Sequence, residues 1–118
     1  MPRNMSFMLT QEQYVDGSKD VTRRLGWGFL KPGDILNGVE KSQGLKKGEK
    51  IKVLGQHEVI STRWEPLYAI TEEDVIREGF PDMTPAEFIA FFRKANKCEW
   101  ATPVNRIEFK KLEVANHD

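Results

Sequence analysis

Short strand-like segments, separated by turn signals instead of by helices, restrict the fold of this chain more than any other feature. Glycine and proline interrupt the first 64 residues repeatedly, as in "LGWGF" and "KPGD". A doubly wound parallel sheet needs a crossover helix between successive strands, and these intervals are not regular helices. The pattern therefore predicts an α+β fold built as a small, mostly antiparallel β-barrel with inserted helices.

The predicted strands differ in how firmly the sequence defines them. Apolar, β-branched or alternating residues predict strands at 6–9, 21–24, 35–40, 51–64 and 104–112. Gly38 is expected to weaken or bulge its strand. Gly55 is expected either to split the longest segment into two strands or to kink it. The lysine-rich stretch from Lys41 to Lys50 is expected to be a loop.

Three helices are predicted from capping signals. Thr10 with Gln13 resembles a capping box, and Gly17 would end the helix over 11–16. Thr71 precedes an acidic first turn, and Gly79 ends that second helix. The third has Thr84 as its cap, followed by Pro85 and Glu87. Its phenylalanines recur at helical spacing, which is typical of core packing.

The size and composition predict one domain over residues 1–118. The chain is 39% hydrophobic and 31% charged, which suits a globular protein with one modest core. It has no apolar run of 18 residues, so we expect no membrane span, and its start lacks the pattern of a signal peptide. The single cysteine, Cys98, excludes an intramolecular disulfide and agrees with a cytoplasmic location.

Charge and the scarcity of metal ligands limit the function. The net charge is zero, with 11 Lys/Arg and 7 Asp/Glu in residues 1–64 and the reverse in residues 65–118. A neutral chain argues mildly against tight, unspecific RNA binding. His57, His117 and Cys98 lack the paired spacing of zinc sites, so no metal is expected. No nucleotide-binding or hydrolase motif points to a cofactor. Nothing in the sequence requires more than a monomer.

The stretch "GSKDVTRR" holds the strongest candidates for chemistry. On a strand, Thr22 and Arg24 share one face, whereas Lys19 reaches that face only if the chain bends near Asp20. A buried lysine has a lowered pKa and can act as a base toward a neighbouring hydroxyl. The other interpretation is that these cations flank a strand and contact water, since this spacing is common. Trp27 and Trp64 are candidates for stacking on a base. The lysines that could contact phosphates are Lys46, Lys47, Lys50 and Lys52. Both sets also suit ordinary core or surface positions.

The strings "GSKDVTRR", "FLKPGD", "ITEEDVIREG" and "RIEFKKL" occur in the order found in ASCH-domain proteins of the PUA-like superfamily, which the chain resembles over residues 6–112. The resemblance implies a barrel with a cleft for RNA or nucleotides. Some small bacterial members are amidohydrolases that remove the acyl group of N4-acetylcytidine. By motif, Lys19 is then the expected base, Thr22 the nucleophile and Glu78 the acid. Gly17, Arg23, Arg24 and Trp27 are the expected ligand-binding residues.

Two hypotheses follow from these residues and this resemblance. The chain is either a binding module for RNA or a modified nucleoside, or an amidohydrolase for an N-acylated cytidine. An RNA-binding module needs a basic, aromatic surface that continues out of the cleft. An enzyme for a free nucleoside needs a pocket of a few hundred Å³ in which Lys19, Thr22 and Glu78 converge.

Overall fold

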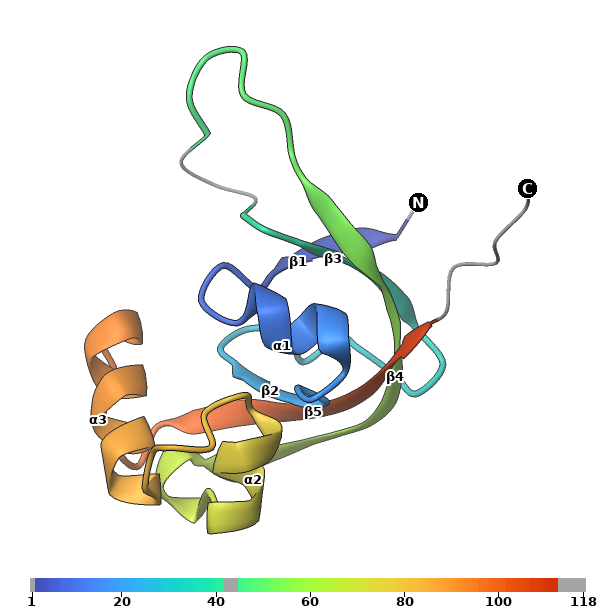
Figure 1. The fold of residues 1–118 in the computed structure, drawn as a ribbon. Coiled ribbons are helices and arrows are strands. Elements are labelled where there is room, and N and C mark those ends of the chain that lie inside the picture. Colours follow the sequence, from blue (N-terminus) through green and yellow to red (C-terminus); the bar gives the residue numbers. More distant parts are fainter. Residues whose placement is uncertain (1, 42–44, 113–118) are drawn as a thin grey trace.

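Five strands form one curled sheet that wraps around a short helix (Figure 1). The structure is a computed structural model that describes residues 2–41 and 45–112. The strands lie in the order β1-β3-β4-β5-β2, with bounds β1 Arg3–Ser6, β2 Val21–Arg24, β3 Ile35–Val39, β4 Val53–Pro66 and β5 Pro103–Leu112. β1 is parallel to β3, and the other neighbouring pairs are antiparallel. This half-barrel confirms the predicted α+β, barrel-like fold, with β1 and β2 as the edges of the sheet.

The strand boundaries depart from the prediction in two places. The first strand is Arg3–Ser6 and not the predicted 6–9. The last backbone hydrogen bond from this segment to β3 is donated by the Phe7 N–H to the Val39 oxygen at 2.8 Å, so the pairing does not reach residue 9. The segment predicted over 51–64 is one continuous strand, so of the two expected effects of Gly55 the split is wrong, whereas the pairing is irregular beside it, where Leu54 is skipped. Gly55 instead pairs with Gly38, and the register shifts directly after Gly38, as expected for a weakened strand.

The main core lies between the sheet and α1 (Gln11–Asp16). Tyr14 of α1 is fully buried and stacks on Phe7 with ring centroids 4.4 Å apart, and its hydroxyl lies 2.8 Å from Nδ1 of buried His57. A Cβ on Gly38 would overlap the Tyr14 ring, so this glycine permits the close approach of α1. Helix α1 forms as predicted, but the Thr10 side chain caps nothing, so the expected capping box is absent.

A second cluster packs the other helices onto one end of the sheet. The turn η1 (Leu67–Ala69) leads from β4 to α2 (Glu72–Arg77), followed by α3 (Pro85–Asn96). Thr71 caps α2, and Thr84 and Glu87 form the predicted capping box at α3. Phe88 and Phe92 are buried in this cluster, which confirms the core assignment for part of the phenylalanine stripe. Within the described residues, no helix has the length and apolar character needed to cross a membrane.

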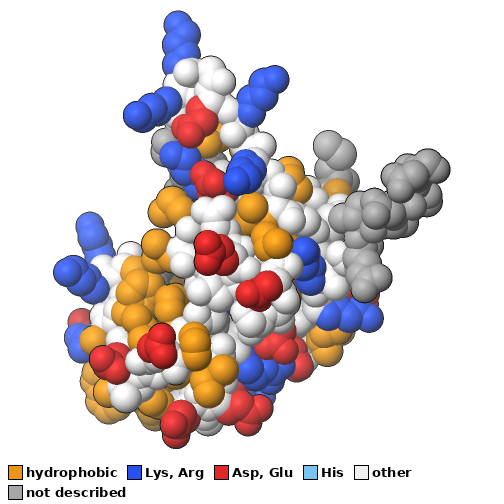
Figure 2. All heavy atoms as spheres, in the orientation of Figure 1, with side chains coloured by type: hydrophobic (Ala, Val, Ile, Leu, Met, Phe, Trp, Pro, Cys, Tyr) orange, Lys and Arg blue, Asp and Glu red, His pale blue; other side chains and the backbone are white. Residues whose placement is uncertain are grey.

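The connection between β3 and β4 projects from the body of the protein (Figure 1). Exposed lysines gather on this projection, as Figure 2 shows, and they include Lys46, Lys47, Lys50 and Lys52. Part of the loop predicted over 41–50, residues 42–44, lies outside the described residues.

Candidate functional site

The chain bends between α1 and β2 and thereby directs Lys19 toward the same cavity as Thr22. Gly17 ends α1 with φ of +83°, a conformation that a glycine adopts without steric cost. The Lys19 N–H then donates to the Gln13 oxygen at 3.0 Å, and the Asp20 N–H donates to the Arg77 oxygen at 3.0 Å. The strand begins only at Val21. The bend near Asp20 that the motif required is therefore present.

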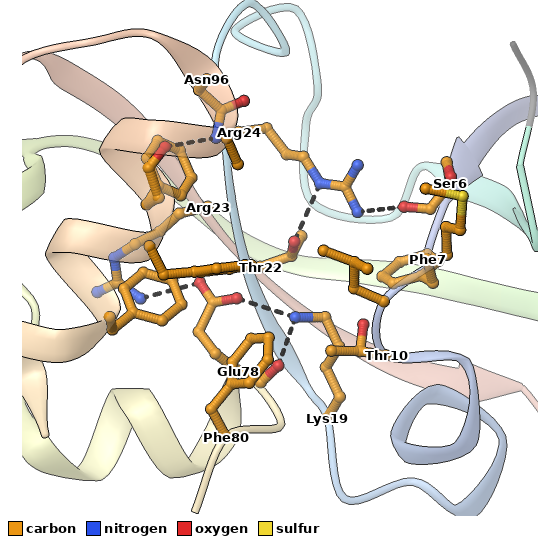
Figure 3. Close-up of a pocket in the computed structure, with 16 residues that line it drawn as sticks. Ser6, Phe7, Thr10, Lys19, Thr22, Arg23, Arg24, Glu78, Phe80 and Asn96 are labelled. Atoms are coloured by element: carbon orange, nitrogen blue, oxygen red, sulfur yellow. Dashed lines mark hydrogen bonds and ion pairs between the residues drawn. The ribbon is translucent and has the colours of Figure 1, made fainter. Parts of the chain in front are cut away.

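The cavity lies where the two edge strands of the sheet meet α2 and α3 (Figure 3), and its volume is about 260 Å³. The segment after β1, the β2 motif, the end of α2 and one face of α3 each supply part of its lining. The lining residues are Ser6, Phe7, Met8, Leu9, Thr10, Lys19, Thr22, Arg23, Arg24, Glu78, Phe80, Phe88, Phe91, Phe92, Ala95 and Asn96. Lys19, Thr22 and Glu78, which the resemblance implied as a catalytic set, thus share one cavity.

Lys19 and Glu78 form a buried ion pair at the base of the cavity. Lys19 Nζ lies 2.9 Å from Glu78 Oε1 and donates a second hydrogen bond to the Glu78 backbone oxygen at 2.6 Å. Each side chain is only 4% exposed. Burial lowers the pKa of the Lys19 ammonium below its ordinary value, although the Glu78 carboxylate acts in the opposite direction. The arrangement eases loss of a proton from Lys19 and gives that proton an acceptor at 2.9 Å.

Arg23 is an internal partner of carboxylates and points away from Arg24. Its guanidinium donates to Glu78 Oε2 at 3.3 Å, to Glu65 Oε2 at 2.8 Å and to Asp74 Oδ2 at 2.6 Å. Arg106 of β5 binds both oxygens of Asp74, at 2.7 and 3.0 Å. Burial alone would raise the pKa of Asp74, but hydrogen bonds from Arg106 and Arg23 outweigh it and hold the pKa well below its usual range. This network fixes the Glu78 carboxylate from the side opposite Lys19.

Arg24 connects Thr22 to the opposite edge strand (Figure 3). Its Nε donates to Thr22 Oγ1 at 3.0 Å, and its Nη2 donates to the Ser6 backbone oxygen at 2.6 Å. Because Oγ1 accepts from Arg24, the Thr22 hydroxyl proton is free to bond another acceptor. No hydrogen bond joins Lys19 to Thr22 within the residues that the structure describes. Thr22 is 3% exposed, so a ligand reaches it only through the cavity.

The wall of the cavity on the helical side is aromatic. Phe80, which follows α2, lies with its ring centroid 5.3 Å from that of Phe91 and 5.8 Å from that of Phe88. Phe91 and Phe88 are themselves 6.1 Å apart, so the three rings form one apolar surface. At the end of α3, Asn96 donates to the Phe92 oxygen at 3.1 Å, which leaves its side-chain oxygen as a free acceptor.

The structure does not bring every predicted site residue to the cavity. Gly17 acts as the end of α1 and is not among the lining residues. Trp27 lies beyond the end of β2, packs on the main core and lies 5.5 Å from the Phe29 ring, so its contact with a ligand stays a prediction. Sequence reasoning missed Phe80 and Phe91 as cavity residues and missed Asp74 and Arg106 as partners of Arg23. The helical phenylalanine stripe was the available signal for the wall.

The polar side chains of this site do not form a metal centre. Across residues 2–41 and 45–112 there is no group of three His, Cys, Asp or Glu side chains arranged to hold a metal ion. Glu78, the acidic residue that lines the cavity, is instead paired with Lys19 and Arg23. The arrangement provides an ion pair that can transfer a proton, a hydroxyl group, and a positive charge held in a fixed position.

Comparison with known proteins identifies the fold. No protein-family model and no curated protein sequence matches the chain. Among crystal structures, the chain is similar to protein EF3133 from Enterococcus faecalis V583, of family DUF984, at 15% identity and a TM-score of 0.66, covering 100% of this chain and 85% of that one. The hypothetical protein PH0355 gives 18% identity and a TM-score of 0.68, with 95% and 100% coverage.

An ASCH domain from Lactobacillus crispatus JV V101 matches over 92% of this chain and 78% of that chain, with 15% identity and a TM-score of 0.62. At these identities the similarity is one of backbone arrangement. The curled sheet and the inserted helices are therefore those of a chain with the ASCH-domain fold.

Proposed function

We propose that the cavity binds a modified nucleoside and hydrolyses the amide of an N-acylated cytidine. The observation that carries this proposal is the convergence of Lys19, Thr22 and Glu78 on one cavity of about 260 Å³. The resemblance of the "GSKDVTRR" motif to ASCH-domain amidohydrolases supplies the substrate class and the three roles. The size of the cavity, which suits a small ligand better than a folded RNA, supports this choice.

The reaction begins with a proton transfer inside the ion pair. Glu78 takes a proton from the Lys19 ammonium across 2.9 Å, which leaves a neutral amine and a neutral carboxylic acid. The amine then removes the Thr22 hydroxyl proton as Oγ1 attacks the acyl carbon. Glu78 returns its proton to the departing amide nitrogen, the C–N bond breaks, and an acyl ester on Thr22 remains.

Water completes the cycle by cleaving that ester. Glu78, now a carboxylate, takes a proton from the water that attacks the acyl carbon, and the Lys19 ammonium returns a proton to Thr22 Oγ1 as the ester bond breaks. The carboxylic acid formed then releases its proton, and transfer from Glu78 to Lys19 restores the starting ion pair. Arg24, 3.0 Å from Thr22 Oγ1, lies where a cation stabilises negative charge that develops on the acyl oxygen.

The test is hydrolysis of N4-acetylcytidine by purified protein, followed through the absorbance of the acylated base. Lys19→Met, Thr22→Val and Glu78→Gln should each reduce kcat by at least ~100-fold while the far-ultraviolet circular dichroism spectrum stays unchanged. Lys110→Met, an exposed lysine of β5, is the matched control and should keep full activity. A folded wild-type protein without turnover on this and related N-acyl cytidines would refute the proposal.

RNA binding is a second candidate, and the exposed lysines of the β3–β4 projection favour it (Figure 2). An RNA held there should dissociate as salt rises, because phosphate contacts release counterions. Replacing Lys46, Lys47 and Lys50 together by glutamine should flatten that salt dependence. Salt-insensitive or absent binding of a single-stranded RNA would exclude this candidate.

A further inference from the structure

The charges around the cavity do not balance, and the unbalanced charge lies on Arg24. Three buried cations, Lys19, Arg23 and Arg106, pair with three carboxylates, Glu65, Asp74 and Glu78, and the partly buried Arg24 beside them is a fourth cation. Arg63 also contacts Glu65, but its side chain is 61% exposed and its charge is therefore solvated by water.

Arg24 differs from these three buried cations. Within the described residues each of those pairs with a carboxylate, whereas Arg24 donates only to the Thr22 hydroxyl and the Ser6 backbone oxygen. A guanidinium has five donors, and two of the nitrogens are used here. Cations shielded from water in proteins are normally paired with an anion, and residues 2–41 and 45–112 supply no carboxylate partner to this partly buried guanidinium, so it is prepared for an external one.

The surface that shares this cavity with Arg24 is apolar and aromatic, with its three rings tilted by 56–58° against one another. Phe80, Phe88 and Phe91 present their rings to the cavity as one wall, with centroid separations between 5.3 and 6.1 Å. Phe80 and Phe91 are only partly buried, so a ring placed against them removes more apolar surface from water. Met8 and Leu9, both more than half exposed, border the same cavity.

We propose that the cavity is a receptor for a monoanion with a flat apolar body, an aryl carboxylate, whose charged group binds Arg24 and whose ring packs on the wall formed by Phe80 and Phe91. One negative charge neutralises the unpaired positive charge of Arg24. The inference rests on the proposed function in taking this cavity as the ligand site. The inference also identifies the acid product of the proposed reaction, because hydrolysis of an aromatic amide releases an aryl carboxylate, which this cavity would hold.

The first experiment compares four small probes by isothermal titration calorimetry on the wild-type chain. Benzoate should bind at least ~10-fold more tightly than benzamide, its neutral isostere, because a charge-assisted bond to a partly buried guanidinium is worth about that ratio or more. Acetate, which has the charge without the ring, should also bind at least ~10-fold more weakly than benzoate. Equal affinity for benzoate and benzamide would overturn the proposal. Tighter binding of the phenyl phosphate dianion would overturn the assignment to carboxylates.

Variants locate the binding in this cavity. Arg24→Gln should remove the preference for benzoate over benzamide, whereas Phe91→Ala should weaken both probes and keep the preference. Arg93→Gln changes an exposed arginine of α3 that does not line the cavity, and it should bind all probes as the wild type does. If Arg24→Gln does not fold, the Phe91→Ala result and the wild-type probe series still decide the question. An unchanged benzoate affinity in Phe91→Ala would overturn the proposal.

The outcome separates this inference from the proposed amide hydrolysis. Benzoate binding with the expected selectivity, in a protein that does not hydrolyse N-acyl cytidines, supports the receptor and refutes the hydrolase. Turnover of N4-acetylcytidine that millimolar benzoate does not inhibit refutes the receptor and leaves the hydrolase in place. Competitive inhibition by benzoate, lost in Arg24→Gln or Phe91→Ala, supports both.

Discussion

Replacing Asp74 by asparagine should destabilise the protein strongly, because Asp74 holds two buried arginines. Its Oδ2 accepts from Arg23 at 2.6 Å and from Arg106 at 2.7 Å, and its Oδ1 accepts from Arg106 at 3.0 Å. Asparagine has the same shape but only one acceptor oxygen, so at least one of these bonds is lost. Asp74 is also the only carboxylate that Arg106 contacts within the described part of the chain.

The magnitude follows from the burial of the charges. Arg23 and Arg106 are 3% and 6% exposed, so the charge of Arg106 would stay inside the protein without its partner. Breaking a buried pair in this way costs about 3–5 kcal/mol. For a domain of this size that loss corresponds to a decrease in Tm of roughly 10–25 °C. It is a large share of a total stability on the order of 5–15 kcal/mol.

Urea unfolding followed by circular dichroism measures this loss, with Glu108→Gln as the control. Glu108 also binds an arginine, at 2.8 Å, but both side chains of that pair are a quarter to a third exposed, and such pairs are worth about 1 kcal/mol or less. A double variant Asp74→Asn with Arg106→Met should recover part of the stability, because it removes the unpaired cation. A loss below about 1 kcal/mol in Asp74→Asn, equal to that of the control, would refute the reasoning.

Three further perturbations test the fold. Burial, with a smaller contribution from the Arg24 charge, lowers the pKa of His57 from 6.5 to about 3. As the pH falls, the unfolded chain therefore binds a proton at this histidine before the folded chain does, and the free energy of unfolding, measured with urea, should decrease by about 2 kcal/mol between pH 7 and pH 5. A His57→Phe variant should lack this part of the pH dependence. Gly38→Ala should cost about 1–3 kcal/mol in the same assay, because its methyl group displaces the Tyr14 ring, and an unchanged stability would contradict the described packing. Thr84→Ala should lower the free energy of unfolding by about 1 kcal/mol, since the N–H of Glu87 loses its cap, whereas Thr84→Ser should cost little.

The sequence predicted those features that depend on neighbouring residues. Helix caps at Thr71 and Thr84 and the two-residue alternation of Thr22 and Arg24 are local patterns, and the structure contains them. The role of Arg23 depends on Glu65 and Asp74, which lie 42 and 51 residues further along the chain. No spacing near Arg23 indicates those partners, and their identity follows only from the pairing of β2 with β5 and from the position of α2.

The errors have a similar physical origin. Gly55 resembled a strand breaker because glycine weakens an isolated strand, but β4 continues through it because Gly55 pairs with Gly38 of β3 and the next residue, Gln56, pairs with Leu112 of β5. The phenylalanine stripe of α3 was assigned to the core, and Phe88 and Phe92 are buried there. Periodicity cannot show that the same face, through Phe91, also borders a cavity, because the cavity exists only where α3 approaches the edges of the sheet.

The meeting of the two sheet edges at Arg24 also bears on how this chain avoids aggregation. An open sheet leaves unpaired N–H and C=O groups along its outer strands, and these can recruit a strand of another molecule. Here both outer strands, β1 and β2, are only four residues long, and Arg24 of β2 donates a hydrogen bond to the Ser6 backbone oxygen of β1. Arg24, which lines the cavity, thus also makes the edges of the sheet less available for pairing with a strand of another molecule. A mutation at this position would then act twice, on ligand capture and on the tendency of the protein to self-associate through its β-structure.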